Sequence, residues 1–368
     1  MDFALTETQA SVAGLASELF TDFGTDERVR EIATSGAGYD TELWARLVET
    51  GLANLALPEA AGGGGLGITE LLLVLEAQGR ALAPVPLWRH SLAGLALAAF
   101  AVGNARAEIL PALATGQIIA TVSVEDIAAP AIELAQDGPS WRLSGTVATL
   151  PYPGDATIAL VPARLGDTVR LAILPLRAKE ITLTHGILTH GEPIADLGID
   201  RLLLADDHVL PGEAGADWLF QRAAACVAAL QLGVAAEAMR RTAEYAGTRH
   251  QFGRPIGSFQ GVALRAADGY IDIEVARGTL MQLGWRLDQG LDATSAAHVA
   301  KYWANQCGHR VAHTTAHLHG GLGADVSYPI HRFLLWARAL EMTAGGAQSH
   351  LFELGELVAD SPTQGTVA

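Results

Sequence analysis

The sequence is poor in cysteine, in charge and in long apolar runs. Only two of its 368 residues are cysteines, Cys226 and Cys307, and they belong to no CxxC pair, which argues against a disulfide framework and a cysteine-ligated metal site. Charged residues make up 17% of the chain, and the formal net charge is −16. A chain with this acidic balance and no long basic run is a poor partner for nucleic acid.

The longest uninterrupted apolar run, residues 92–103, is shorter than the roughly 18 residues that a membrane-spanning helix needs. The first residues, MDFALTETQ, contain neither the basic nor the apolar segment of a secretory signal. Both observations predict a cytoplasmic protein without a membrane segment. Because 50% of the residues are hydrophobic, we also expect large buried or subunit-facing surfaces and therefore an oligomer.

The hydrophobic pattern divides the chain into three parts. Apolar residues recur at helical spacing up to about residue 116, short β-like runs separated by Gly, Pro and Asp fill most of the next part, and long alanine-rich helical segments follow. This order predicts an α+β fold with an N-terminal all-α domain over 1–116, a middle β domain over 117–211 and a C-terminal α-helical domain with a polar tail over 212–368. It argues against alternating βα units.

Two local patterns have ordinary explanations that we favour. Residues 62–67 match the GxGxxG spacing of dinucleotide-binding loops, but no buried strand precedes them and no βαβ unit follows, so we predict a mobile loop. His309, His313 and His317 share one helical stripe, where imidazoles one turn apart could chelate a metal. No acidic or cysteine ligand accompanies them at metal-binding spacing, so we expect no metal and interpret them as polar groups at a helix interface.

The most informative segment is TRHQFGRPIGSFQ, residues 248–260. It predicts a helix that ends in a tight turn and a second helix with Ser258 as its N-cap. Arg249 supplies a planar fork that suits a phosphate, Phe252 an aromatic face, and Gln260 an amide that can bond a ribose or a ring edge. An ordinary helix corner with solvated arginines is the alternative.

A second segment, HLHGGLG at residues 317–323, places glycines where the backbone must come close to another group. A helix C-cap followed by a turn is its ordinary explanation. Two such segments in the same helical region support each other.

These two segments, in this order and spacing, resemble the FAD-binding signatures RxxFGxPIxxFQ and QxHGGxGxxxxYPxxR of the acyl-CoA dehydrogenase family. The resemblance covers nearly the whole chain and is nearest to the base-lacking subunits of actinobacterial heteromeric steroid side-chain dehydrogenases. It implies the acyl-CoA dehydrogenase fold, with an N-terminal helical domain, a central β-barrel-like domain and a C-terminal four-helix bundle. It also implies FAD, an acyl-CoA substrate dehydrogenated to a trans-2-enoyl-CoA, and an electron-transferring flavoprotein or similar acceptor.

The resemblance implies which residues contact FAD and which residue should act as the base. The usual catalytic glutamate falls on Ala344, so the base is unknown. Glu341, Glu244 and Glu237 are the nearest remaining carboxylates, and we keep Glu341 as the candidate for a displaced base. The implied FAD contacts, in which His317 replaces the usual glutamine, are Arg249, Phe252, Ile256, Gln260, His317, Gly320 and Gly321.

In the family, each flavin lies between two subunits. This chain matches the neighbour's share, whereas its own share departs from the pattern: residues 124–130 replace TEPxxGSD, Thr149 and Pro151 stand where a tryptophan and a threonine flank the ring, and Gly346 replaces a threonine. The resemblance therefore implies a subunit that completes the flavin site of a second acyl-CoA dehydrogenase subunit in an α2β2 heterotetramer acting on a bulky or steroid side-chain CoA ester. Two alternatives stay open, namely a self-sufficient homotetramer with a relocated base and a flavin-free acyl-CoA-binding or structural homologue.

Overall fold

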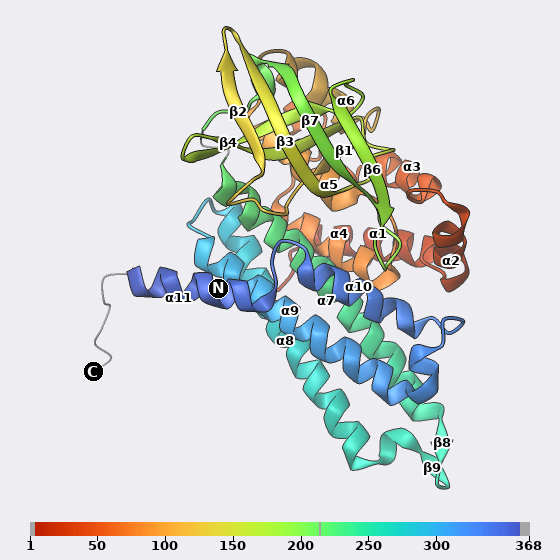
Figure 1. Cartoon of the computed structure of the whole chain (residues 1–368). Helices are drawn as coiled ribbons and strands as arrows, with labels where there is room; N and C mark the ends of the chain where they lie inside the picture. The colour runs from red at the N-terminus through yellow and green to blue at the C-terminus, as the bar shows by residue number, and fades with distance from the viewer. Residues whose placement is uncertain (1–3, 213–214, 361–368) are drawn as a thin grey trace.

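The computed structural model describes residues 4–212 and 215–360, and helices form the N-terminal part of it (Figure 1). Residues 361–368 of the predicted polar tail lie outside the described residues. The helical elements of this part are α1 (Glu7–Phe23), α2 (Asp26–Ser35), α3 (Thr41–Glu49), η1 (Glu59–Ala61), α4 (Ile68–Ala81), α5 (Leu87–Phe100), η2 (Ala105–Ile109) and α6 (Leu110–Ala114).

Local caps explain where two of these helices begin. At α1, the Thr6 hydroxyl accepts a hydrogen bond from the Gln9 backbone N–H, and the Gln9 side chain accepts one from the Thr6 N–H. At α3, the Asp40 carboxylate accepts the backbone N–H of Leu43 and pairs with Arg28 of α2. Asp40 therefore fixes the angle between two consecutive helices as well as the start of one.

The middle part is one curled sheet that lies at the top of Figure 1. The strands are hydrogen-bonded in the order β1-β4-β2-β3-β7-β6, with β5 paired to β4. β1 runs parallel to β4, and β3 runs antiparallel to both β2 and β7. The bounds are β1 (Ala120–Val122), β2 (Ile132–Asp137), β3 (Ser140–Pro151), β4 (Ile158–Leu165), β5 (Thr168–Pro175), β6 (Ile181–Ile187) and β7 (Pro193–Ala205), with η3 (Asp206–His208) after them.

Helices return in the C-terminal part, where α7, α8, α9 and α10 pack together and α11 crosses α9. α7 is long and apolar enough to span a membrane by length and composition, but 78% of its most apolar window is buried, as in the core helix of a folded domain. The elements are α7 (Ala216–Thr248), β8 (His250–Gln251), β9 (Arg254–Pro255), η4 (Ile256–Ser258), α8 (Gln260–Asp288), α9 (Thr294–His319), η5 (Gly320–Ala324), α10 (Ile330–Met342) and α11 (Ala347–Asp360).

Two glycines bring the N-terminal and C-terminal helices into close contact. A Cβ atom on Gly233 of α7 would lie 2.0 Å from the carbonyl oxygen of Glu76, and one on Gly79 of α4 would lie 2.2 Å from that of Leu230. Only glycine permits this backbone approach, so α4 and α7 are locked together at their crossing. The two helical parts share one core as a result.

The structure confirms the predicted α+β order and corrects one detail. Ser258 is not the N-cap of α8: its hydroxyl donates to the Pro255 carbonyl, and the helix begins at Gln260 after Phe259.

Candidate functional site

The first predicted FAD-binding segment forms the turn between α7 and α8. Arg249 directly follows α7, Gln260 opens α8, and both are exposed. Phe252 stands at the tip of the β8–β9 hairpin with a left-handed φ of 53° and 92% of its surface exposed. Figure 1 shows this hairpin at the far end of the C-terminal helices from the sheet. A ligand held here therefore lies on the outside of this chain.

The second segment lies beside the first. His319 of α9 stacks on Tyr245 of α7, with 4.4 Å between the ring centroids. Gly320 adopts φ 61° and ψ −133°, a backbone conformation that only glycine enters readily. No atom lies within 4 Å of the Cβ positions of Gly320 and Gly321, and His317 is exposed in the last turn of α9. The backbone here is open to a group from outside the chain.

These two segments fit one share of an FAD site. Arg249 carries a permanent charge and a planar fork for a pyrophosphate, and Gln260 can both donate to and accept from a ribose. Phe252 offers an uncovered aromatic face, and the open backbone at Gly320 and Gly321 permits close approach. Ile256 lies half-buried in η4, between the hairpin and α8.

The predicted own-subunit share lies elsewhere, around a cavity of about 430 Å³ between the sheet, α5 and α10. Thr149, Pro151 and Thr343 all line it, so the fold brings together the segments that depart from the family pattern. None of the described residues that line it is aromatic, and four carry ionisable groups. The four are Arg89, Glu125, Glu192 and Arg338.

The charged groups make this cavity unlike a flavin-ring site. Arg89 is 4% exposed, lies over the Trp88 ring, and donates to the Val122 carbonyl at 2.9 Å and to Glu192 at 3.4 Å. A flavin ring in this cavity would have to pack against the buried Arg89–Glu192 ion pair, and no described aromatic side chain of the lining could stack on it. The residues present therefore do not fit a complete flavin site within this chain.

Ala344 follows α10 and is buried with a φ of 57°. Glu125 approaches it from the β domain and lies against its backbone. Burial raises the pKa of Glu125, although the positive charge of Arg89 opposes this shift. The sequence analysis did not single out Glu125 as a candidate, although residue 125 falls on the glutamate of the TEPxxGSD pattern.

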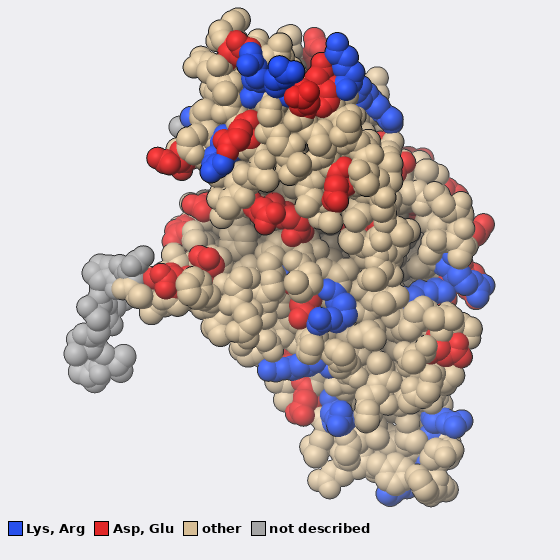
Figure 2. Space-filling view, viewed as in Figure 1, with Lys and Arg blue, Asp and Glu red and all other residues tan. Residues whose placement is uncertain are grey.

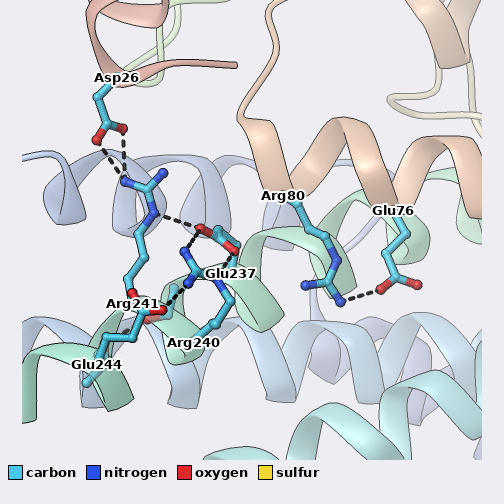
Figure 3. A network of polar contacts seen from close by, with 9 residues as sticks. Asp26, Glu76, Arg80, Glu237, Arg240, Arg241 and Glu244 are labelled. Carbon is cyan, nitrogen blue, oxygen red and sulfur yellow. Dashed lines mark hydrogen bonds and ion pairs between the residues drawn. The ribbon is translucent and has the colours of Figure 1, made fainter. Parts of the chain in front are cut away.

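The three carboxylates that the sequence put forward have other partners. Glu341 pairs with Arg338 and lies 3.3 Å from His309. Glu237 pairs with Arg240 and Arg241, as Figure 3 shows. In the same network, Glu244 pairs with Arg240, and Arg241 also reaches Asp26 of α2. Among the described residues that line the cavity, none of these three glutamates is present.

The glycine-rich loop before α4 is a closely packed turn, and its predicted mobility stays a prediction. A Cβ on Gly63 would lie 2.2 Å from the Leu57 carbonyl oxygen, so glycine is needed for packing within the loop. The N-terminus of α4 is occupied by Asp288 of α8, whose carboxylate accepts the N–H of Ile68 at 2.6 Å and that of Thr69 at 3.1 Å. A pyrophosphate would have to displace this carboxylate.

The histidine stripe on α9 lies on an exposed part of the helix. The His309 and His313 rings lie 4.6 Å apart between centroids and are tilted by 54° to each other. Within residues 4–212 and 215–360, no group of three His, Cys, Asp or Glu side chains is placed to hold a metal ion.

Comparisons with known proteins match both helical parts of the chain. The model of the acyl-CoA dehydrogenase N-terminal domain matches residues 6–117, and that of the C-terminal domain matches residues 212–356. The chain is 34% identical to acyl-CoA dehydrogenase FadE27 of Mycobacterium tuberculosis, over 98% of this chain and 100% of that protein. It is similar to a structure titled as a Tcur3481-Tcur3483 steroid ACAD variant, with 41% identity, a TM-score of 0.92, and 96% of this chain and 98% of that chain covered.

A second solved structure, the ChsE4-ChsE5 complex from Mycobacterium tuberculosis, is 35% identical with a TM-score of 0.94, over 99% of this chain and 100% of that chain. Family-model matches cover both helical parts, and the FadE27 similarity spans almost the entire chain. The chain therefore belongs to the acyl-CoA dehydrogenase family of FAD-dependent oxidoreductases.

Proposed function

We propose that this chain is the non-base subunit of a heteromeric acyl-CoA dehydrogenase and completes an FAD site whose catalytic glutamate belongs to a partner chain. One contrast carries the proposal. The exposed Arg249, Phe252 and Gln260 keep the share that a neighbouring subunit supplies. The described residues that line the cavity beside Ala344, in contrast, include four ionisable groups and no aromatic one.

The residues of this chain bind and orient within the proposed site. FAD supplies the hydride acceptor for α,β-dehydrogenation when it is bound. Arg249 would neutralise the pyrophosphate, Gln260 would bond a ribose or ring edge, and Phe252 would cover an aromatic face. Ile256, His317, Gly320 and Gly321 would complete this contact surface. Removal of the α-proton requires a carboxylate within hydrogen-bond reach, and we assign that group to the partner.

Two observations support an α2β2 assembly acting on a bulky or steroid side-chain CoA ester. Two of the similar solved structures have titles that name two chains. One is the ChsE4-ChsE5 complex, and the other is the Tcur3481-Tcur3483 steroid ACAD variant. Figure 2 shows broad uncharged areas over the C-terminal helices, whereas both signs of charge gather over the sheet. Low charge density is typical of the core of a large obligate interface. An electron-transferring flavoprotein or similar protein is the proposed electron acceptor.

The test is FAD binding by the complex of this chain with its candidate partner, comparing wild type with Arg249→Ala. A charge-assisted phosphate contact is worth about 1.5–3 kcal/mol, so FAD affinity should fall by roughly 10- to 100-fold. Arg265→Ala is the matched control, because Arg265 is also an exposed arginine but lies within α8, outside the proposed FAD contacts. Unchanged affinity in Arg249→Ala would contradict the proposal.

A self-sufficient enzyme with a relocated base is the second candidate, and the contact between Glu125 and Ala344 favours it. The chain expressed alone decides between the two. One flavin per chain with turnover that Glu125→Gln abolishes supports the second candidate, and a parallel Glu341→Gln variant tests the carboxylate that the sequence put forward. Little flavin alone, with one flavin per pair of unlike chains, supports the first.

A further inference from the structure

α11 is joined to the rest of the C-terminal part by a buried pair of histidines. His350 of α11 is 3% exposed and His298 of α9 is 9% exposed. Their Nδ1 atoms lie 3.2 Å apart. Phe220 of α7 packs against both rings, with centroid distances of 4.6 Å to His298 and 5.7 Å to His350. Three helices therefore meet at these two imidazoles.

The hydrogen bonds assign a proton to each ring. His350 Nε2 lies 3.1 Å from the Gly345 carbonyl oxygen, which can only accept, so Nε2 carries hydrogen. In neutral His350 the Nδ1 atom is then an acceptor, and it accepts the Nδ1–H of His298. A proton added to His350 enters at Nδ1 and turns this hydrogen bond into two N–H groups facing each other.

The same carbonyl group fastens the segment that precedes α11. The Gly345 oxygen also accepts from Asn305 Nδ2 at 3.1 Å and from Lys301 Nζ at 3.3 Å, and both donors belong to α9. Loss of the His350 contact therefore loosens the start of α11 from α9, while Lys301 and Asn305 continue to hold Gly345.

The charged groups around the pair act on it from every packed helix. Lys301 of α9 opposes a positive charge on His350, and so does His298. Burial lowers the pKa of His298, and Glu353 of α11 and Asp217 of α7 oppose this shift. None of these groups offers His350 Nδ1 a new acceptor in the docked arrangement, because His298 occupies that position.

We propose that His350 is an acid-sensitive contact: its protonation releases α11 from α9 and frees the apolar side chains of that helix from their fixed place. Leu351, Phe352 and Val358 are the exposed apolar residues that α11 carries. Acidification thereby changes the position of α11, which lies at one side of the C-terminal helices (Figure 1).

The expected size of the effect follows from linkage. Burial, followed by Lys301 and His298, lowers the pKa of His350 to about 4, whereas a released histidine titrates near 6.5. A group whose pKa is lower when docked loses docking free energy as the pH falls from the released value toward the docked value. The opening equilibrium of α11 should therefore rise about 20-fold between pH 7 and pH 5.

Hydrogen–deuterium exchange of the full-length chain tests this. Exchange of amides in residues 350–356, corrected for the intrinsic effect of pH, should rise about 20-fold from pH 7 to pH 5, while the middle of α9 stays protected. His350→Gln keeps an N–H for the Gly345 carbonyl but cannot titrate, so its rise should be clearly smaller than that of wild type, with His298 alone left to titrate. His313→Asn removes an exposed histidine from α9 and should behave as wild type.

Three results would overturn the inference: exchange of α11 that does not change with pH, the same rise in His350→Gln, or a parallel loss of protection in α9. A measurement on the wild-type chain guards against a variant that fails to fold. The His350 imidazole should titrate near 4 by NMR, and titration near 6.5 would overturn the inference as well.

Discussion

Glu125 lies against the backbone of Ala344, so a side chain of the β domain contacts the segment that follows α10. Lys301 holds the same segment from α9, with its Nζ 3.1 Å from the Leu340 carbonyl oxygen and 3.3 Å from that of Gly345. The segment is fixed from two sides although its central residue carries only a methyl group. A defined backbone at this position therefore does not require a functional base.

Replacing Ala344 with glutamate should not create a second active site. In the described part of the chain, no aromatic residue lines the nearby cavity, and Glu125 and Glu192 would repel a third carboxylate. We expect Ala344→Glu to leave both the flavin content and the turnover of the complex with its partner unchanged. Flavin content and turnover are measured on the same preparation, with thermal unfolding as the check on folding. A doubling of both values would contradict the proposed division of roles.

Ala344→Gly should stabilise the chain. The left-handed φ of 57° costs alanine about 1–2 kcal/mol, and glycine removes this cost while losing about 0.5–1 kcal/mol to the entropy of the unfolded chain. The expected net gain is about 0.5–1 kcal/mol, read from the urea midpoint. Ala339→Gly is the control, because Ala339 lies within α10 and the same change there should destabilise by about 0.5–1 kcal/mol. Destabilisation by both variants would contradict the strain at Ala344.

Asp288→Ala should destabilise the contact between the N-terminal and C-terminal helices. The carboxylate accepts two backbone N–H groups at the start of α4 and the Thr69 hydroxyl, so its removal leaves partly buried donors without an acceptor. We expect a loss of about 1–3 kcal/mol in urea unfolding. Asp200→Ala provides the comparison, because the Asp200 side chain is 83% exposed and should cost little. Equal losses would show that capping by Asp288 is unimportant.

The Asp40–Arg28 pair should make the chain sensitive to acid. Burial alone would raise the pKa of Asp40, but the hydrogen bonds from Arg28 and from the Leu43 backbone hold it below its ordinary value. A carboxylate with a lowered pKa in the folded state stabilises the protein above the unfolded pKa, near 3.9, and this stability is lost as the pH falls through the folded pKa. Asp40→Asn should therefore be less stable than wild type at pH 7, and the difference should shrink at pH 3.

Unfolding free energies at the two pH values check this expectation. Glu42→Gln is the control, because Glu42 also bonds Arg28 but its side chain is 67% exposed. A stability difference between wild type and Asp40→Asn that stays constant from pH 7 to pH 3 would rule out the assigned role of the Asp40 carboxylate.

The sequence predicted the features that depend on neighbouring residues. Helical periodicity and β-like runs are local signals, so the order helices, sheet, helices was predictable, as was the turn that carries Arg249 and Phe252. The proposed boundaries at 116/117 and 211/212 and the proposed FAD contacts remain predictions. Ser258 was assigned wrongly as an N-cap, because its hydroxyl bonds Pro255 instead of the first turn of α8.

The features that the sequence did not predict depend on packing between distant segments. Glu125 lies near Ala344 only because the sheet packs close to α10 in the folded chain. Arg89 and Lys301 are buried charges, one in an apolar helix and one in an alanine-rich helix, and nothing in the local pattern indicates their partners. The pairing of His298 with His350 joins residues 52 apart on different helices. Periodicity carries no information about such contacts.

The cap on α4 can form only late in the synthesis of the chain. Asp288 lies 220 residues after Ile68, whose N–H it accepts. When the ribosome has finished the N-terminal helices and the sheet, the first turn of α4 still has no acceptor for these amides. Only after α8 has emerged and folded back can this end of α4 be closed. A nascent chain that stops before α8 therefore exposes a helix end that the finished protein covers.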